Sequence, residues 1–277
     1  MTPGIRYMLT ATVFFTLMNI GVKSLPRIPS YEIVFFRALV SLVLGYILIK
    51  RAGLSPWGNK KSLLIMRGVT GTIALLMYFW TLQVMPLATA ATLIQMSPIF
   101  TIILAGFMVK EPPRPIQWLF FLTSFVGVIM IKGFDARITP WELVVGLTAA
   151  FFAGLAYNYI RKLKGHDDPL VVVFYFPLVT VPLVGTYTAL HWVQPTPLEW
   201  VILIMTGLVV TIAQIFMTKA YQMEKAANVS NFTYVGVVLS IIVGWVIFDE
   251  AITLLAFTGI GLIILGVIMA TRYKQTA

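Results

Sequence analysis

The chain has 277 residues, of which 59% are hydrophobic and only 11% are charged, and its net charge is +10. Soluble domains carry about 25% charged residues, so this composition excludes a fold with a water-facing surface, and lipid must be its main solvent. The absence of cysteine excludes disulfides, thiolate catalysis and cysteine metal sites.

Turn and charge signals divide the chain into ten apolar segments, each close to the roughly 20 residues that a helix needs to cross a bilayer. The connections between them are too short for a soluble domain. Residues 1–6 lack the features of a cleaved signal peptide and are predicted to stay in the mature protein. We therefore predict an all-α membrane protein with ten transmembrane helices, at 5–23, 31–49, 64–83, 86–109, 115–131, 141–160, 169–190, 199–220, 226–248 and 253–271.

The basic residues form short clusters between these segments, and most of them fall on one side of the predicted membrane. An excess of Lys and Arg marks the cytoplasmic side, so both termini are predicted to be cytoplasmic, in a cytoplasmic (inner) membrane. This clustering indicates a lipid bilayer as the partner and argues against nucleic acid. One set of connections holds Arg6, Lys50, Arg51, Lys60, Lys61, Lys110, Arg114, Arg161, Lys162, Lys164, Lys225, Arg272 and Lys274, and the other holds Lys23, Arg27, Lys132 and Arg137.

Sliding the sequence along itself by 139 residues brings scarce polar residues of the spans into register. This offset predicts two repeats, 1–138 and 139–277, with five spans each. Because five is odd, the second repeat must enter the membrane upside down relative to the first, an arrangement that recurs in transporters. The matched pairs include Asn19 with Asn158, Lys23 with Lys162, Gln83 with Gln222, and Glu111 with Glu250.

Three stretches carry a resemblance to a known family: IVFFRALVSLVL (33–44), RGVTGTIALLMYFWTLQVMPLATAATLIQMSPIFTIILAGFMVKE (67–111) and AANVSNFTYVGVVLSIIVGWVIFDE (226–250). The chain resembles the drug/metabolite transporter (DMT) superfamily in its EamA-like branch. The most recognisable feature is a span that ends in a glutamate in each half, at Glu111 and Glu250. The resemblance covers essentially the whole chain.

This resemblance implies ten helices in two inverted halves around a central cavity, with transport by alternating access. The third, fourth, eighth and ninth helices would dominate the lining of the cavity. Members carry amino acids, nucleotide-type metabolites, vitamins or drugs, so the resemblance defines a class and not a cargo. Related small multidrug exporters use a glutamate in the first helix, and the first span here has no acidic residue, which argues against proton-coupled export of hydrophobic cations.

Arg37 lies about 9 Å inside the second span, at 1.5 Å per residue. A charge at that depth is costly unless it is paired or hydrated, and such residues usually serve a function. We interpret Arg37 as a binding point for a substrate carboxylate or phosphate, or as one side of an outer gate. The alternative is an arginine that snorkels outwards or pairs with Glu32.

The fourth and ninth spans carry matching polar residues at every third position, so each set lies along one helical face. These faces are predicted to line the substrate path near mid-depth, and the alternative is hydrogen bonding between helices. Four glycines, Gly127, Gly259, Gly261 and Gly266, are predicted to allow close helix approach. The two polar sets are Thr89, Thr92 and Gln95, and Asn228, Asn231 and Tyr234.

Further candidates have a second interpretation as packing or interface residues. Asn19 and Asn158 are repeat partners near opposite ends of their spans, and Pro98 interrupts the fourth span and is a candidate hinge. The predicted substrate-binding residues are Arg37, Tyr78, Thr92, Gln95, Asn158, Gln214, Asn228, Asn231 and Tyr234, and the predicted gate or hinge residues are Asn19, Pro98 and Gly236.

Enzyme signatures are absent from the sequence. His166 and His191 fall in connections on opposite sides of the membrane, and there is no phosphate-binding glycine-rich loop. No catalytic residue, metal or cofactor is therefore predicted. We predict a secondary-active or exchange transporter for a small polar or amphipathic metabolite, with amino acids or their derivatives favoured. The alternatives are a non-transporting channel or scaffold and an intramembrane lipid-modifying enzyme, and homodimer formation is left open.

Overall fold

The computed structural model describes residues 2–108, 115–134, 138–223, 230–251 and 253–272. These residues form helices and their connections, with no strand among them. The helices are α1 (Pro3–Lys23), α2 (Ser30–Arg51), α3 (Lys61–Val84), α4 (Leu87–Ile94), α5 (Ser97–Met108), α6 (Pro115–Phe134), α7 (Pro140–Lys162), α8 (Pro169–Leu190), α9 (Pro197–Met223), the 3₁₀ turn η1 (Ser230–Thr233), α11 (Tyr234–Phe248) and α12 (Leu254–Arg272).

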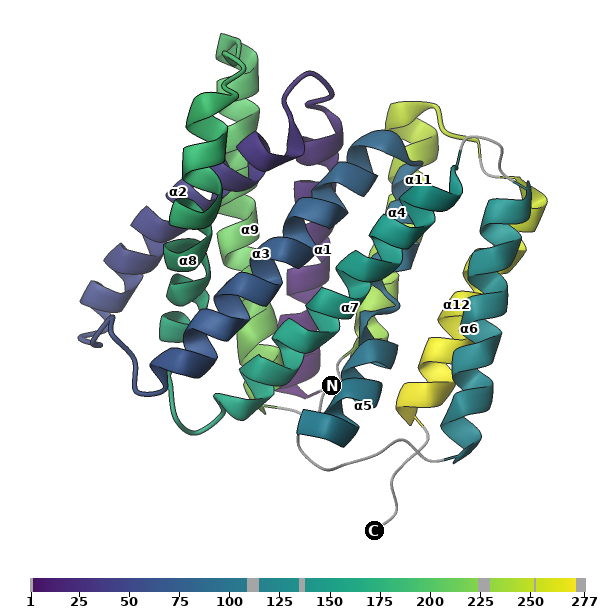
Figure 1. Ribbon diagram of the computed structural model, residues 1–277, viewed down its shortest axis with the longest axis horizontal. Helices are drawn as coiled ribbons and strands as arrows, with labels where there is room; N and C mark the ends of the chain where they lie inside the picture. Colours follow the sequence, from purple (N-terminus) through teal and green to yellow (C-terminus); the bar gives the residue numbers. More distant parts are fainter. Residues whose placement is uncertain (1, 109–114, 135–137, 224–229, 252, 273–277) are drawn as a thin grey trace.

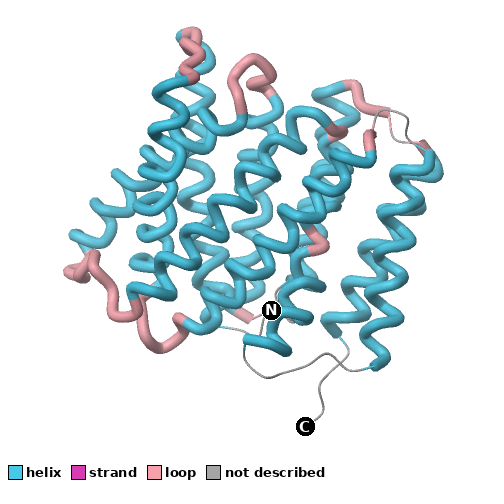
Figure 2. Tube along the Cα trace, in the orientation of Figure 1, coloured by secondary structure: helices cyan, strands magenta, loops and turns pink. Residues whose placement is uncertain are grey.

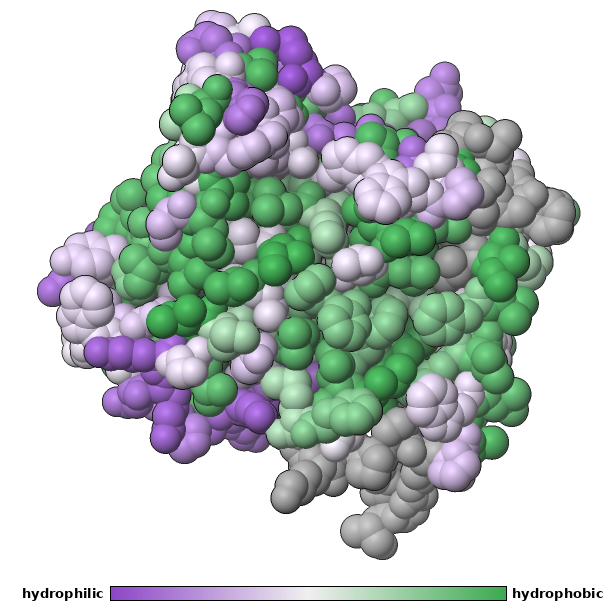
Figure 3. Space-filling model, in the orientation of Figure 1, coloured by the Kyte–Doolittle hydropathy of each residue, from purple (hydrophilic) through white to green (hydrophobic). Residues whose placement is uncertain are grey.

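The helices lie side by side as a bundle (Figure 2). In the described part of the chain, seven spans are long and apolar enough to cross a membrane, with α4 and α5 counted as one, and α6, α11 and α12 add three shorter apolar helices. Hydrophobic side chains cover most of the middle of the visible face, and hydrophilic ones gather near its upper and lower ends (Figure 3). The predicted all-α fold with ten membrane spans is confirmed.

Proline and capping residues define where several helices begin. Pro140, Pro169 and Pro197 each occupy the first position of a helix, where the missing N–H is not needed and the fixed φ suits the helix. Thr139 caps α7 by accepting a hydrogen bond from the Glu142 N–H at 3.2 Å, and the Glu142 carboxylate accepts one from the Thr139 N–H at 2.7 Å. This reciprocal capping satisfies backbone donors that would otherwise face lipid headgroups unpaired.

The fourth span is broken near mid-membrane, because α4 ends at Ile94 and α5 begins at Ser97. Pro98 has no N–H to donate to the Ile94 carbonyl, four residues earlier, so the regular ladder cannot continue. The Gln95 and Met96 N–H groups instead donate to carbonyls three residues back, each at 3.0 Å. The ninth span is also irregular, since η1 precedes α11. The sequence predicted one interruption at Pro98, and the break lies two to three residues before it.

Contacts between helices join the two halves of the chain. Helix α1 packs along α9, α3 along α7, and α2 along α8. Helices α6 and α12 pack closely on each other and stand at one edge of the bundle (Figure 1).

Helix α1 begins and α12 ends on the lower side in Figure 1. We call this side the N-terminal face and the other side the opposite face.

The α6–α12 contact depends on glycine. A Cβ atom at Gly127 would lie 2.5 Å from the Gly259 carbonyl oxygen, and one at Gly266 would lie 2.3 Å from Ser124 Oγ. Both distances are too short for real contacts, so the two helix backbones approach closely only because side chains are missing here. Gly261 was predicted to serve the same purpose, which is wrong, because a Cβ at Gly261 would meet no described atom within 4 Å.

We therefore predict that Gly127→Ala lowers the free energy of unfolding by about 1–3 kcal/mol, the usual effect of overpacking. Gly261→Ala is the matched control and should change it by about 0.5 kcal/mol or less. Denaturant titration of purified protein in detergent measures both. Equal stability of the two variants would contradict the role assigned to Gly127.

Candidate functional site

A cavity of about 150 Å³ lies inside the bundle and is lined by residues of α1, α2, α3, α4, α5, α7, α8, α9, η1 and α11. Its wall combines aromatic and aliphatic side chains with polar ones, as in small-molecule sites generally. Of the described residues that line it, none is acidic and two are arginines. The polar lining consists of Thr12, Thr16, Asn19, Arg37, Arg67, Tyr78, Gln95, Ser97, Tyr157, Gln214, Tyr221 and Thr233.

Arg37 on α2 is 1% exposed, and its three guanidinium nitrogens have no hydrogen-bond partner among the described residues. Its Cζ lies 5.6 Å from the ring centroid of Phe79 and 5.2 Å from that of Phe176. Glu32 is not its partner: Glu32 Oε2 accepts a hydrogen bond from the Val193 N–H at 3.0 Å, and Glu32 Oε1 has no partner among the described residues. The alternative reading of Arg37 as one member of an ion pair with Glu32 is therefore wrong.

Arg67 on α3 is a second buried arginine of the cavity wall, and sequence reasoning missed it. It is 3% exposed, and its Nη2 donates to Gln214 Oε1 at 3.1 Å, while Nε and Nη1 have no partner among the described residues. The segment boundary placed Arg67 near a membrane surface, beside Lys60 and Lys61. The structure shows that Gly71, one turn further along α3, leaves room for this side chain, because a Cβ there would lie 3.2 Å from Arg67 Nη1; no pattern in the sequence singled Arg67 out.

Seven of the predicted site residues line the cavity. Gln95, at the break between α4 and α5, donates from Nε2 to the Thr233 carbonyl at 3.1 Å and accepts from Thr233 Oγ1 at 2.8 Å. This pair joins the two irregular spans. The cavity wall includes the predicted residues Arg37, Tyr78, Gln95 and Gln214, and the predicted gate and hinge residues Asn19, Pro98 and Gly236 are in it too.

Two predicted binding residues do not line the cavity. Thr92 is fully buried and donates to the Ala88 carbonyl at 2.7 Å, and Asn158 is fully buried and donates to the carbonyls of Thr101 and Gly154. A three-residue spacing advances roughly 300° around a helix, so Thr89, Thr92 and Gln95 drift by about 60° per step. Gln95 therefore faces the cavity, whereas Thr92 and Thr89, which precede it on α4, turn progressively away from it.

The structure describes only part of the matching polar set that was predicted in the ninth span. Asn228 lies outside the described residues, and for Asn231 and Tyr234 the structure describes the backbone alone. Glu111 also lies outside the described residues. Gly236 sits in the third position of α11, after the irregular turn η1, so the irregular backbone of this span precedes it.

A buried ion pair ties the two halves together at the opposite face. Lys23 Nζ at the end of α1 lies 2.6 Å from Glu250 Oε1, and both side chains are less than 15% exposed. Lys23 also donates to the Met85 carbonyl at 2.7 Å, while Glu250 Oε2 accepts from the Leu87 N–H at 2.7 Å. The glutamate that carries the family resemblance thus caps the first turn of α4 and pairs with α1.

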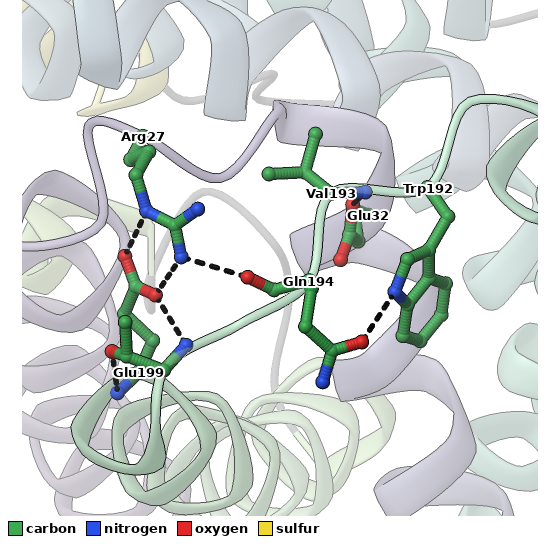
Figure 4. A network of polar contacts seen from close by, with 7 residues as sticks. Arg27, Glu32, Trp192, Val193, Gln194 and Glu199 are labelled. Carbon is green, nitrogen blue, oxygen red and sulfur yellow. Dashed lines mark hydrogen bonds and ion pairs between the residues drawn. The ribbon is translucent and has the colours of Figure 1, made fainter.

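A second polar network at the same face joins the α1–α2 connection to the α8–α9 connection (Figure 4). Arg27 donates to both carboxylate oxygens of Glu199 and to the Gln194 carbonyl. The hydrogen bond from Arg27 to Glu199 raises the pKa of the arginine.

At the N-terminal face, Asp167 accepts from the backbone N–H groups of Asn59 and Lys60, at 2.5 and 3.1 Å. Contacts between the halves therefore exist at both faces.

We predict that Lys23→Met lowers the free energy of unfolding by about 2–3 kcal/mol, because it leaves the Glu250 carboxylate largely buried without its counterion. Lys61→Met, on an exposed lysine, is the control and should be nearly neutral. Denaturant titration in detergent compares them. An unchanged midpoint for Lys23→Met would show that the ion pair contributes nothing to stability.

Comparison with known proteins agrees with this architecture. The model of the EamA-like transporter family matches the chain twice, over residues 2–133 and 140–272. The pseudopaline exporter of Pseudomonas aeruginosa is 33% identical over 279 residues, which cover 98% of this chain and 97% of that protein. The riboflavin transporter of Vibrio cholerae is 26% identical, with coverage of 98% and 93%.

A more distant relative is the S-adenosylmethionine uptake transporter of Rickettsia prowazekii, 25% identical over 89% of this chain and 85% of that protein. A solved crystal structure superposes with a TM-score of 0.72 at 18% identity and covers 97% of this chain and 96% of its own, which supports the fold. The family match spans nearly the whole chain, and the relatives are transporters by name. The chain therefore belongs to the EamA-like transporter family and is a membrane-embedded small-molecule transporter.

Proposed function

We propose that this protein is a secondary-active or exchange transporter that moves a small metabolite with an anionic group across the cytoplasmic membrane, with amino acids or their derivatives favoured. The observation that carries the proposal is Arg37, a fully buried cation that points into a cavity and has no described protein partner. A charge inside the membrane is costly unless something pairs with it. A substrate carboxylate is the partner that offsets this cost.

The rest of the cavity wall suits an amphipathic ligand. Tyr78 and Phe176 present aromatic surface, and Asn19, Gln95 and Gln214 present amide groups. Such a wall can bury the apolar body of a metabolite while a few polar groups fix its orientation. The volume of about 150 Å³ supports a small cargo rather than a peptide or a lipid.

We further propose that residues 1–138 and 139–277 are inverted repeats that exchange conformations during alternating access. Under the 139-residue offset, the contact of α1 with α9 becomes that of α7 with α3, and both contacts are present. The contacts of α2 with α8 and of α6 with α12 map onto themselves. The two separate family matches support the same division.

The lysine and arginine distribution supports a cytoplasmic N-terminal face. In that orientation the Lys23–Glu250 pair closes the outer side, and its separation would open the cavity outwards. The named relatives include both exporters and uptake transporters, so the proposal assigns no direction to transport.

The function is tested by flux into proteoliposomes, with a labelled panel of amino acids, amino-acid derivatives and nucleosides. Saturable flux of at least one compound is expected, and exchange should accelerate it. Linear, unsaturable flux would indicate a channel. The absence of flux for every compound in both directions would overturn the proposal.

We predict that Arg37→Ala abolishes saturable flux of anionic and zwitterionic cargo while the protein stays folded. Folding should survive because Arg37 has no described carboxylate partner that the substitution would leave unpaired in the membrane. Arg51→Ala, on an exposed arginine at the end of the same helix, should transport normally. Wild-type flux in a folded Arg37→Ala variant would remove Arg37 from the binding site.

A single introduced cysteine tests whether the Lys23–Glu250 pair closes the outer side of the cavity, because the chain has no cysteine of its own. Ala91→Cys places a thiol in the cavity wall. Adding Lys23→Met should raise the rate at which a membrane-impermeant thiol reagent labels this cysteine from the outer side. Adding Lys61→Met should leave the rate unchanged. Equal rates in both double variants would show that the ion pair is not part of the barrier.

A further inference from the structure

The two buried arginines of the cavity converge on one aromatic ring. Arg67 Cζ lies 4.3 Å from the ring centroid of Phe176, and Arg37 Cζ lies 5.2 Å from the same centroid. The two guanidinium carbons are therefore less than 10 Å apart. A positive charge is attracted to the face of an aromatic ring, so Phe176 holds both cations near each other without neutralising either of them.

The arginines reach this ring from opposite ends of the membrane. Arg37 lies seven residues from the start of α2, about 10 Å from the opposite face, and Arg67 lies six residues from the start of α3, about 9 Å from the N-terminal face. Helices α2 and α3 run in opposite directions, so the two arginines approach Phe176 from different faces of the membrane. A ligand that contacts both must extend between them.

Most of the hydrogen-bonding capacity of this pair is unused. Five guanidinium nitrogens, namely all three of Arg37 together with Nε and Nη1 of Arg67, have no partner among the described residues. The remaining nitrogen, Arg67 Nη2, donates to the neutral amide of Gln214. Among the described residues of the cavity wall, none is acidic and could balance either charge.

We propose that the cavity is a two-arginine site for a small dicarboxylate, amino dicarboxylates included, with one carboxylate on each guanidinium. This proposal rests on the proposed transport function and narrows its substrate class. Guanidinium groups bind carboxylates through paired, charge-assisted hydrogen bonds. A monocarboxylate would neutralise one arginine and leave the other buried and unpaired, so the second carboxylate should contribute strongly to affinity.

Gln214 acts in this site as a positioning residue for Arg67. Its amide oxygen occupies one guanidinium nitrogen and leaves the other two for the ligand. A carboxylate at this position would instead form an ion pair and compete with the substrate. Gln214→Glu should therefore weaken dicarboxylate binding, and the loss should be smaller at low pH, where the introduced carboxyl group is protonated.

The test is binding of matched ligands to purified wild-type protein, measured by calorimetry and by thermal shift. The probes are straight-chain dicarboxylates from malonate to adipate, aspartate and glutamate, and the monoamide of each, which keeps the shape and removes one charge. At least one diacid should bind ten times more tightly than its monoamide, equivalent to about 1.4 kcal/mol. If no diacid binds more tightly than its monoamide, the proposal is overturned.

Variants locate the effect within the cavity. Arg37→Gln and Arg67→Gln should each reduce the preference for diacid over monoamide to near unity, while Arg51→Gln should retain it. A preserved preference in a folded Arg67→Gln variant would overturn the two-arginine site. The wild-type ligand series needs no variant, so a folding failure does not affect it.

Flux measurements separate this proposal from the one on which it rests. Saturable flux of monocarboxylic amino acids without any preference for diacids would leave the transport function standing and overturn the two-arginine site. Selective diacid binding without flux of any compound would support the site and overturn the transport function.

Discussion

The structure depends on one electrostatic constraint, which is that two positive charges are buried inside a protein whose solvent is lipid. Arg37 and Arg67 are each almost fully buried, and neither has an acidic partner among the cavity-wall residues that the structure describes. Their position against the Phe176 ring reduces the cost of burial only in part. This unbalanced buried charge is the observation on which the proposed binding of anionic metabolites rests.

The broken spans make room for such a site. A continuous apolar helix satisfies its own backbone and offers little to a polar ligand. The interruption between α4 and α5 turns Gln95 towards Thr233, next to the irregular start of the ninth span. Irregular backbone is tolerated at membrane depth only where it borders a cavity or protein, and here it forms part of the cavity wall. Pro98 is the chemical cause of the break and lines the same space.

Polar contacts at its surfaces join the two halves of the molecule, in addition to the packing of α1 on α9, α3 on α7 and α2 on α8. The Lys23–Glu250 pair and the Arg27–Glu199 pair both connect the first half to the second at the opposite face. Such contacts can exchange with water or with lipid headgroups when the halves separate, whereas a packed apolar interface would lose much more free energy. The α6–α12 pair, which depends on Gly127 and Gly266, stands apart from the cavity and is suited to a static role.

The sequence by itself determined the membrane class, the ten spans and the position of Arg37 inside a span, because hydropathy, proline positions and an isolated charge are local properties of the chain. It also singled out Gln95, Gln214, Tyr78 and Asn19, all of which line the cavity. Only the tertiary structure placed Arg67 in the cavity and removed Thr92 and Asn158 from it. The reason is geometric: the direction of a side chain near a helix break, and the fate of an arginine near a span's end, depend on which neighbouring helices pack there, and periodicity along one chain does not encode that choice.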